Sequence, residues 1–159
     1  MIFEFGQYKV DIDVCKTQNF YENAAFVSEG CSCDGCQNFE KAVAALPQVV
    51  QSFFTQLGID MGKICECYVN CVNEDGTLLY GGFYHVCGVI LSGDSAWIKI
   101  DENTAYWETE NAFRVSRNFC VCFQESVDLL EEDFPQPAIQ LEILADIPWV
   151  LEKENSYSL

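Results

Sequence analysis

The clearest shortage in this sequence is positive charge. Eight Lys and Arg residues stand against 25 Asp and Glu residues, which gives a formal net charge of −17. A surface of this sign repels the phosphates of nucleic acids and of anionic lipids. The composition therefore argues against nucleic acid and membrane surfaces as partners, and it favours a basic protein or a cation. Because acidic surfaces also keep proteins soluble, the charge alone defines no function.

Export signals and long apolar runs are also missing. Residues 1–10 lack the basic stretch and the uninterrupted apolar stretch of a secretory signal. No run approaches the roughly 18 apolar residues that a membrane-spanning helix requires. We therefore expect a cytoplasmic protein whose thiols are mostly reduced. The sequence also contains one histidine and no glycine-rich phosphate loop, which argues against nucleotide binding and against hydrolysis by a nucleophile–histidine pair.

What the chain does contain indicates one globular domain over residues 1–159. Half of the residues are apolar and 14% are aromatic, so this length supplies one substantial core without a disulfide or a metal. No repeat or linker divides the chain.

The periodicity of apolar residues predicts an α+β fold with a mainly antiparallel sheet. Helical spacing over 39–46 and 49–57, with Pro47 between the two segments and Gly58 after them, predicts two consecutive helices in the N-terminal third. A short acidic helix is expected over 125–134. Two-residue alternation and turn signals predict the strands 2–5, 8–14, 64–72, 78–91, 96–100, 104–107, 113–123 and 138–147.

The most informative motif is the C-x-C-x2-C arrangement of Cys31, Cys33 and Cys36. It precedes the first of the two predicted helices, where the partial positive charge of the helix N-terminus stabilises the thiolate form. Thiolates bind zinc, and a structural zinc site takes four tetrahedral ligands. We therefore predict a zinc site at these three cysteines, with His85 as the candidate for the fourth ligand.

Other interpretations of these residues remain open. A lone histidine such as His85 is more often hydrogen-bonded in or beside the sheet than a metal ligand, and the three thiols can be inert or hold an iron–sulfur cluster. Cys33 and Cys36 also form the C-x-x-C pair of a dithiol oxidoreductase, although no clear strand precedes them. The further cysteines of the predicted strand 64–72 share one face with Val69 and are typical of a core: Cys65, Cys67 and Cys71.

Three segments of the chain resemble a group of small uncharacterised bacterial proteins. They are residues 31–39, which carry a C-x-C-x2-C-x-N-F pattern, residues 78–85 and residues 147–151. The resemblance implies a bacterial cytoplasmic protein. It implies no activity, because none is assigned to that group.

Two functional hypotheses follow from these features. The first is a non-enzymatic protein with a structural zinc site in the cysteine loop and a protein-binding acidic face. This face is predicted between residues 118 and 152, where eight acidic residues occur without any Lys or Arg, among them Glu131, Glu132 and Asp133. The alternative is an enzyme, either a zinc-dependent hydrolase or a dithiol oxidoreductase, that uses the same cysteine loop.

Overall fold

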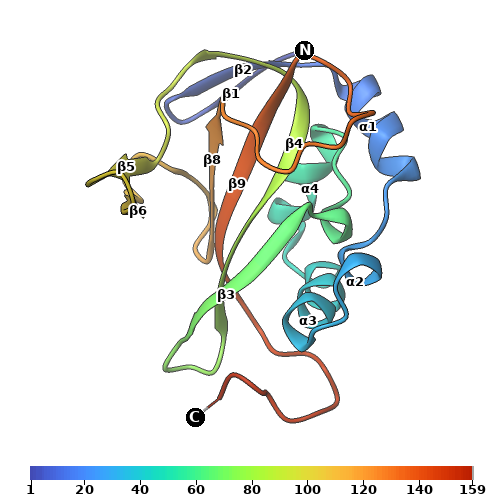
Figure 1. Cartoon of the computed structure of the whole chain (residues 1–159), viewed down its shortest axis with the longest axis vertical. Helices are drawn as coiled ribbons and strands as arrows, with labels where there is room; N and C mark the ends of the chain where they lie inside the picture. The colour runs from blue at the N-terminus through green and yellow to red at the C-terminus, as the bar shows by residue number, and fades with distance from the viewer. Residues whose placement is uncertain (159) are drawn as a thin grey trace.

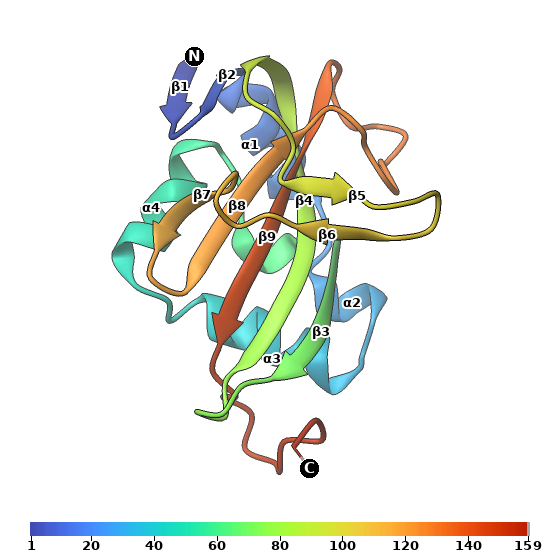
Figure 2. The same ribbon diagram turned by 90° about the vertical axis from the view of Figure 1, so that its left-hand side faces the viewer.

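A seven-stranded antiparallel sheet carries the helices on one side, and a computed structural model describes it over residues 1–158 (Figure 1). The strands of this sheet are β1 (Ile2–Phe5), β2 (Tyr8–Ile12), β3 (Glu66–Val72), β4 (Leu78–Ser92), β7 (Phe113–Ser116), β8 (Phe119–Gln124) and β9 (Ala138–Ile147). The helices are α1 (Val14–Asn23), α2 (Val27–Gly30), α3 (Asp34–Val43), α4 (Gln48–Gln56) and the 3-10 helix η1 (Met61–Lys63). A separate hairpin of β5 (Trp97–Lys99) and β6 (Ala105–Trp107) lies on the opposite side of the sheet from the helices (Figures 1 and 2).

Strand β4 is the centre of the sheet. The strand order is β1-β2-β4-β9-β8-β7, and β3 also pairs with β4. All of these pairs are antiparallel. The predicted α+β class with a mainly antiparallel sheet and consecutive early helices is confirmed. Within residues 1–158, no helix combines the length and the apolar character needed to cross a membrane.

One edge of β4 is shared by two strands that do not meet. Pairing with β3 reaches Phe83, and pairing with β2 begins at Gly88. Between them the Tyr21 hydroxyl of α1 donates to the carbonyl of His85 at 2.8 Å and accepts from its amide at 3.1 Å. This hydroxyl satisfies two buried backbone groups that would otherwise lack partners. Helix α1 thereby replaces the missing strand.

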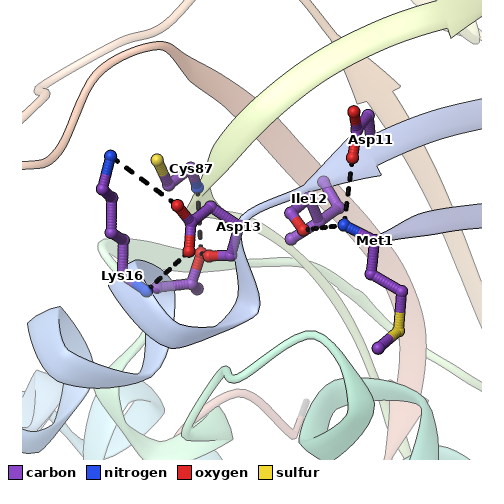
Figure 3. Close-up of polar contacts among 7 residues, drawn as sticks. Met1, Asp11, Ile12, Asp13, Lys16 and Cys87 are labelled. Carbon is purple, nitrogen blue, oxygen red and sulfur yellow. Dashed lines mark hydrogen bonds and ion pairs between the residues drawn. The ribbon is translucent and has the colours of Figure 1, made fainter.

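The predicted strand 8–14 is too long. In the structure strand β2 ends at Ile12, and helix α1 begins at Val14. Asp13 caps the helix, because its carboxylate accepts a hydrogen bond from the Lys16 amide at 3.0 Å (Figure 3). Thr17 then accepts a hydrogen bond from the Cys87 amide at 3.1 Å, which ties the first turn of α1 to β4. The apolar alternation of the strand continues to Val14, but the cap at Asp13 starts a helix there.

The two predicted helices correspond to α3 and α4. Helix α3 begins at Asp34, several residues before the apolar spacing becomes visible, and Cys33 is its N-cap. Helix α4 follows Pro47, and the chain leaves it through Gly58 at a φ of 83°, a left-handed conformation that favours glycine. The ring of Phe39 on α3 packs on Tyr80 of β4 with centroids 5.3 Å apart. This contact fixes α3 on the sheet.

Two other predicted elements differ from the structure. The predicted strand 113–123 is a hairpin of β7 and β8, because the chain turns at residues 117–118 and the Arg117 carbonyl accepts from the Arg114 side chain at 2.7 Å. The predicted acidic helix 125–134 is an irregular loop. In that loop Leu129 has a φ of 54°, and the amide of Asp128 donates to the Gln140 side chain at 2.7 Å. Both features are incompatible with a continuous helix.

Candidate metal centre

The three cysteines of the C-x-C-x2-C motif meet at one point. The sulfurs of Cys31, Cys33 and Cys36 all lie within 4.8 Å of one another. Cys31 follows α2, Cys33 is the N-cap of α3, and Cys36 lies in the first turn of α3. Cys31 and Cys33 are exposed, whereas Cys36 is buried. The loop between two helices therefore gathers three soft ligands that could hold a metal ion.

Local geometry favours negative charge on the sulfur of Cys31. The sulfurs of Cys31 and Cys33 are 3.3 Å apart, and the Cys33 sulfur accepts a hydrogen bond from the Cys36 amide at 3.4 Å. Hydrogen bonds from the backbone and the side chain of Cys33 lower the pKa of Cys31. The free amides at the start of α3 add partial positive charge. These contacts favour the thiolate of Cys31, which is the form that binds metal.

A fourth sulfur adjoins the cluster from the sheet. Cys67 of β3 lies with its sulfur 3.8 Å from the sulfur of Cys36, and both residues are buried. Burial raises the pKa of Cys67 to about 12, and burial together with the neighbouring Cys67 raises the pKa of Cys36. Without a metal, both thiols are therefore protonated at neutral pH.

Cys67 differs from the other cysteines of its strand. The sequence pattern places Cys65, Cys67 and Cys71 on one face, but the pairing of β3 with β4 shifts between Val69 and Cys71. After this irregularity Cys71 is exposed, while Cys67 stays buried under α3. Gly81 and Gly82 pair regularly with Tyr68 and Cys67.

His85 was predicted as a fourth ligand, and the structure gives it a different set of contacts. It is buried in β4, and its Nε2 lies 3.2 Å from Oε1 of Gln140 on the adjacent strand β9. Its ring packs against Phe83 and Phe134. Burial lowers the pKa of His85. The group of ligand atoms that lie within 4.8 Å of one another includes neither His85 nor Cys67, but Cys67 contacts its member Cys36.

Helix α3 is held in place next to the cysteines by a buried asparagine. The side chain of Asn38 donates to the carbonyl of Pro148 at 3.1 Å and accepts from the amide of Val150 at 2.7 Å. The hydroxyl of Tyr80 donates to the carbonyl of Gly35 at 2.8 Å. These bonds join the segments 31–39, 78–85 and 147–151.

The C-terminal residues add a polar cover over the same helix start. The ammonium group of Lys153 lies 2.5 Å from a carboxylate oxygen of Asp34, and the Ser156 hydroxyl donates to the other oxygen at 3.1 Å. These contacts lower the pKa of Asp34, and the contact with Lys153 has the largest effect. Figure 1 shows this end of the chain below α3, near β3. The negative charge of Asp34 is thereby compensated beside the thiols.

A cavity of about 980 Å³ opens beside the cysteines. Helix α1, the segment before α2, the start of β3 and the loop around Leu129 form its wall, and Cys31, Cys36 and Cys67 line one part of it. Two lysines also line it, and Lys63 donates to the carbonyl of Tyr21 at 2.6 Å. The size is that of a small-molecule site, with a mixed apolar and charged lining.

Sequence reasoning did not identify a buried carboxylate on the opposite side of the sheet. Glu142 of β9 is buried and accepts hydrogen bonds from the indole of Trp97, from Gln124 at 2.8 Å and from Gln140 at 3.1 Å. Burial raises the pKa of Glu142. Because Trp97 belongs to β5, this carboxylate fastens the β5–β6 hairpin to the sheet. The alternation of residues along β9 gave no signal that Glu142 would be buried.

Comparison with known proteins adds no function to this geometry. No protein-family model matches the chain, and neither a curated protein nor a solved structure matches it at a significant level. The arrangement of the cysteines is therefore the observation from which a function has to be argued.

Proposed function

We propose that this chain is a non-enzymatic zinc protein in which Cys31, Cys33 and Cys36 bind a structural zinc ion. The observation that carries the proposal is the convergence of three sulfurs within 4.8 Å at the start of α3. A metal bound there would fix the loop between α2 and α3. All ten cysteines are free, which fits a reducing compartment such as the bacterial cytoplasm.

Thiolate chemistry supports zinc over harder cations. Sulfur ligands select zinc, copper(I) or iron–sulfur clusters, whereas calcium and magnesium take oxygen ligands. In structural zinc sites a tetrahedron of cysteine and histidine ligands at about 2.3 Å for sulfur is the rule. An iron–sulfur cluster is built from the same thiolates and is the principal competing occupant.

Elemental analysis of protein purified without a histidine tag is expected to find about one zinc per chain. Cys36→Ser should reduce this content severely, because it removes the one buried sulfur of the group. Cys15→Ser is the matched control, since Cys15 is a free, exposed cysteine outside the group. Protein that contains no zinc and takes up none in a titration contradicts the proposal. A coloured protein with iron and sulfide after anaerobic purification would assign the cluster instead.

One observation favours a second candidate, a dithiol oxidoreductase. Cys33 caps α3 and accepts a hydrogen bond from the Cys36 amide, which is how a reactive dithiol is held at a helix start. In that reaction two thiols would give up two electrons and two protons to a disulfide substrate, which would become two thiols. A reversible Cys33–Cys36 disulfide in zinc-free protein with a measurable redox potential would support this candidate.

We further propose that the loop 125–134 serves as an acidic surface for a basic protein partner. Glu131, Glu132 and Asp133 are exposed in this loop, and the side chain of Leu129 is 68% exposed beside them. This arrangement is complementary to a partner surface on which basic residues surround an apolar residue, because the apolar residue would contact Leu129 and the basic residues would face the carboxylates. Such a field accelerates association with a basic protein.

Charge reversal tests the acidic surface. Replacing Glu131, Glu132 and Asp133 with lysine is expected to weaken capture of a single basic partner at least about tenfold, mainly by slowing association. The matched control reverses three exposed glutamates elsewhere: Glu74, Glu102 and Glu110. Association rates measured at rising salt should fall for the unmodified protein. Equal loss of binding in both triple variants, or capture of abundant basic proteins only, would leave this loop with no role beyond solubility.

A further inference from the structure

The zinc site that we propose has three ligands in one loop, and the structure offers a fourth from a different element. We infer that Cys67 of β3 completes a closed four-thiolate site with Cys31, Cys33 and Cys36. This inference rests on the proposed zinc binding and specifies its coordination. It also decides between a structural site and an open, catalytic one, because a hydrolase needs a coordination position for water.

The distance between Cys36 and Cys67 is that of two ligands of one zinc ion. Four sulfurs at about 2.3 Å from a central zinc in a tetrahedron lie about 3.8 Å from one another. The sulfurs of Cys36 and Cys67 are 3.8 Å apart. Two buried cysteines from a helix and a strand are therefore already spaced as a tetrahedral edge.

The other two sulfurs can adjust to this edge. Cys31 and Cys33 are exposed in the loop between α2 and α3, and their sulfurs are 3.3 Å apart. At least one of these two sulfurs lies more than 4.8 Å from the sulfur of Cys67, because Cys67 is outside the group of mutually close sulfurs. Reaching tetrahedral spacing therefore requires the sulfurs of Cys31 and Cys33 to separate by about 0.5 Å and to move toward Cys67. Exposed side chains accept such a change easily, whereas Cys36 and Cys67 are fixed by the packing of α3 on β3. The buried pair thus forms the rigid half of the site.

A closed site of this kind acts as a cross-link in the fold. Helix α3 and strand β3 lie next to each other (Figure 1), and the ligands are up to 36 residues apart in the sequence, from Cys31 to Cys67. The metal would join the cysteine loop to the sheet edge, as a disulfide does in proteins of oxidising compartments. Cys31, Cys36 and Cys67 line the adjacent cavity. A zinc ion with four sulfur ligands would therefore have no position for an exchangeable water molecule on the cavity side.

Cobalt and zinc binding by single cysteine variants tests this inference. Cys67→Ser is expected to bind zinc at least about 100-fold more weakly than the unmodified protein, because loss of an outer-shell partner alone costs up to that factor. Its cobalt complex should show weaker thiolate-to-metal charge-transfer absorption. Two control variants are Cys65→Ser and Cys71→Ser, which lie on either side of Cys67 in the sequence. Both should bind zinc and cobalt like the unmodified protein.

X-ray absorption spectroscopy of the zinc-loaded, unmodified protein gives an answer that does not depend on how the variants fold. Four sulfur neighbours support the inference, and three sulfurs with one oxygen or nitrogen overturn it. Unchanged zinc affinity in a folded Cys67→Ser protein overturns it as well. Failure of the unmodified protein to bind zinc at all is a separate result, because it refutes the proposed function itself.

Discussion

Removal of zinc is expected to lower the free energy of unfolding by about 4 kcal/mol, if the free zinc concentration before removal is about 1,000 times the dissociation constant. A ligand that binds the folded chain and not the unfolded chain stabilises it by this linkage. For a domain of this size the loss corresponds to a decrease of about 10 °C in Tm. Calorimetry with and without a chelator measures the effect directly.

The protein without zinc should still fold, because its core does not depend on the metal. The largest fully buried side chains are aromatic and aliphatic residues of the sheet and helices, such as Phe39, Phe54 and Tyr84. A variant with serine at the three loop cysteines provides the control, since its Tm should not respond to the chelator. An identical Tm of the unmodified protein in zinc and in chelator would contradict a structural role of the metal.

Gly82→Ala is expected to be strongly destabilising and to weaken zinc binding at the same time. A Cβ atom at Gly82 would lie 2.4 Å from the carbonyl oxygen of Glu66 and 3.1 Å from the Cα of Cys67. Because these are backbone atoms, β3 has to move away from β4. We expect a cost of about 3 kcal/mol, at the upper end of the usual range for overpacking. The same movement separates Cys67 from Cys36.

Two other glycine substitutions serve as controls for Gly82→Ala. In Gly81→Ala the new Cβ meets the ring of Tyr68 at 2.5 Å, but this side chain is 42% exposed and can turn away. Gly30→Ala places a Cβ next to the cysteine loop with nothing within 4 Å. Both should cost at most about 1 kcal/mol. Denaturant unfolding and chelator competition measure the two effects, and equal behaviour of all three variants would argue against the role given to β3.

The sequence predicts well those elements whose apolar residues are the ones buried by neighbouring elements in the structure. Alternation of Ile139, Leu141, Ile143, Ala145 and Ile147 predicts β9, which spans the predicted residues, and all five side chains are buried. Helix α1 was missed because apolar alternation continues past its cap. The loop 125–134 reads as a helix from its charges, but contacts with Gln140 of a distant strand determine its conformation.

The candidate site was predictable only in its local part. The spacing of Cys31, Cys33 and Cys36 and the nearby helix start are sequence properties, and their convergence follows from them. The position of Cys67 depends on how α3 packs on β3 and on the register shift after Val69, so the pattern alone made it equivalent to Cys65 and Cys71. His85 is the sequence's candidate for the fourth ligand because it is the one histidine, but only the structure provides its partner, Gln140.

The position of β3 in the sheet has a consequence for the kinetics of the metal. Among the described strands β3 is hydrogen-bonded to β4 alone, whereas β4 and β9 are bonded along both edges. Edge strands of this kind separate from a sheet by local fluctuations that cost less free energy than global unfolding. A zinc ion that bridges α3 and β3 would leave when this one strand opens. Its dissociation rate, and the hydrogen-exchange rates of the β3 amides, would then be governed by the same local opening, while the rest of the sheet stays folded.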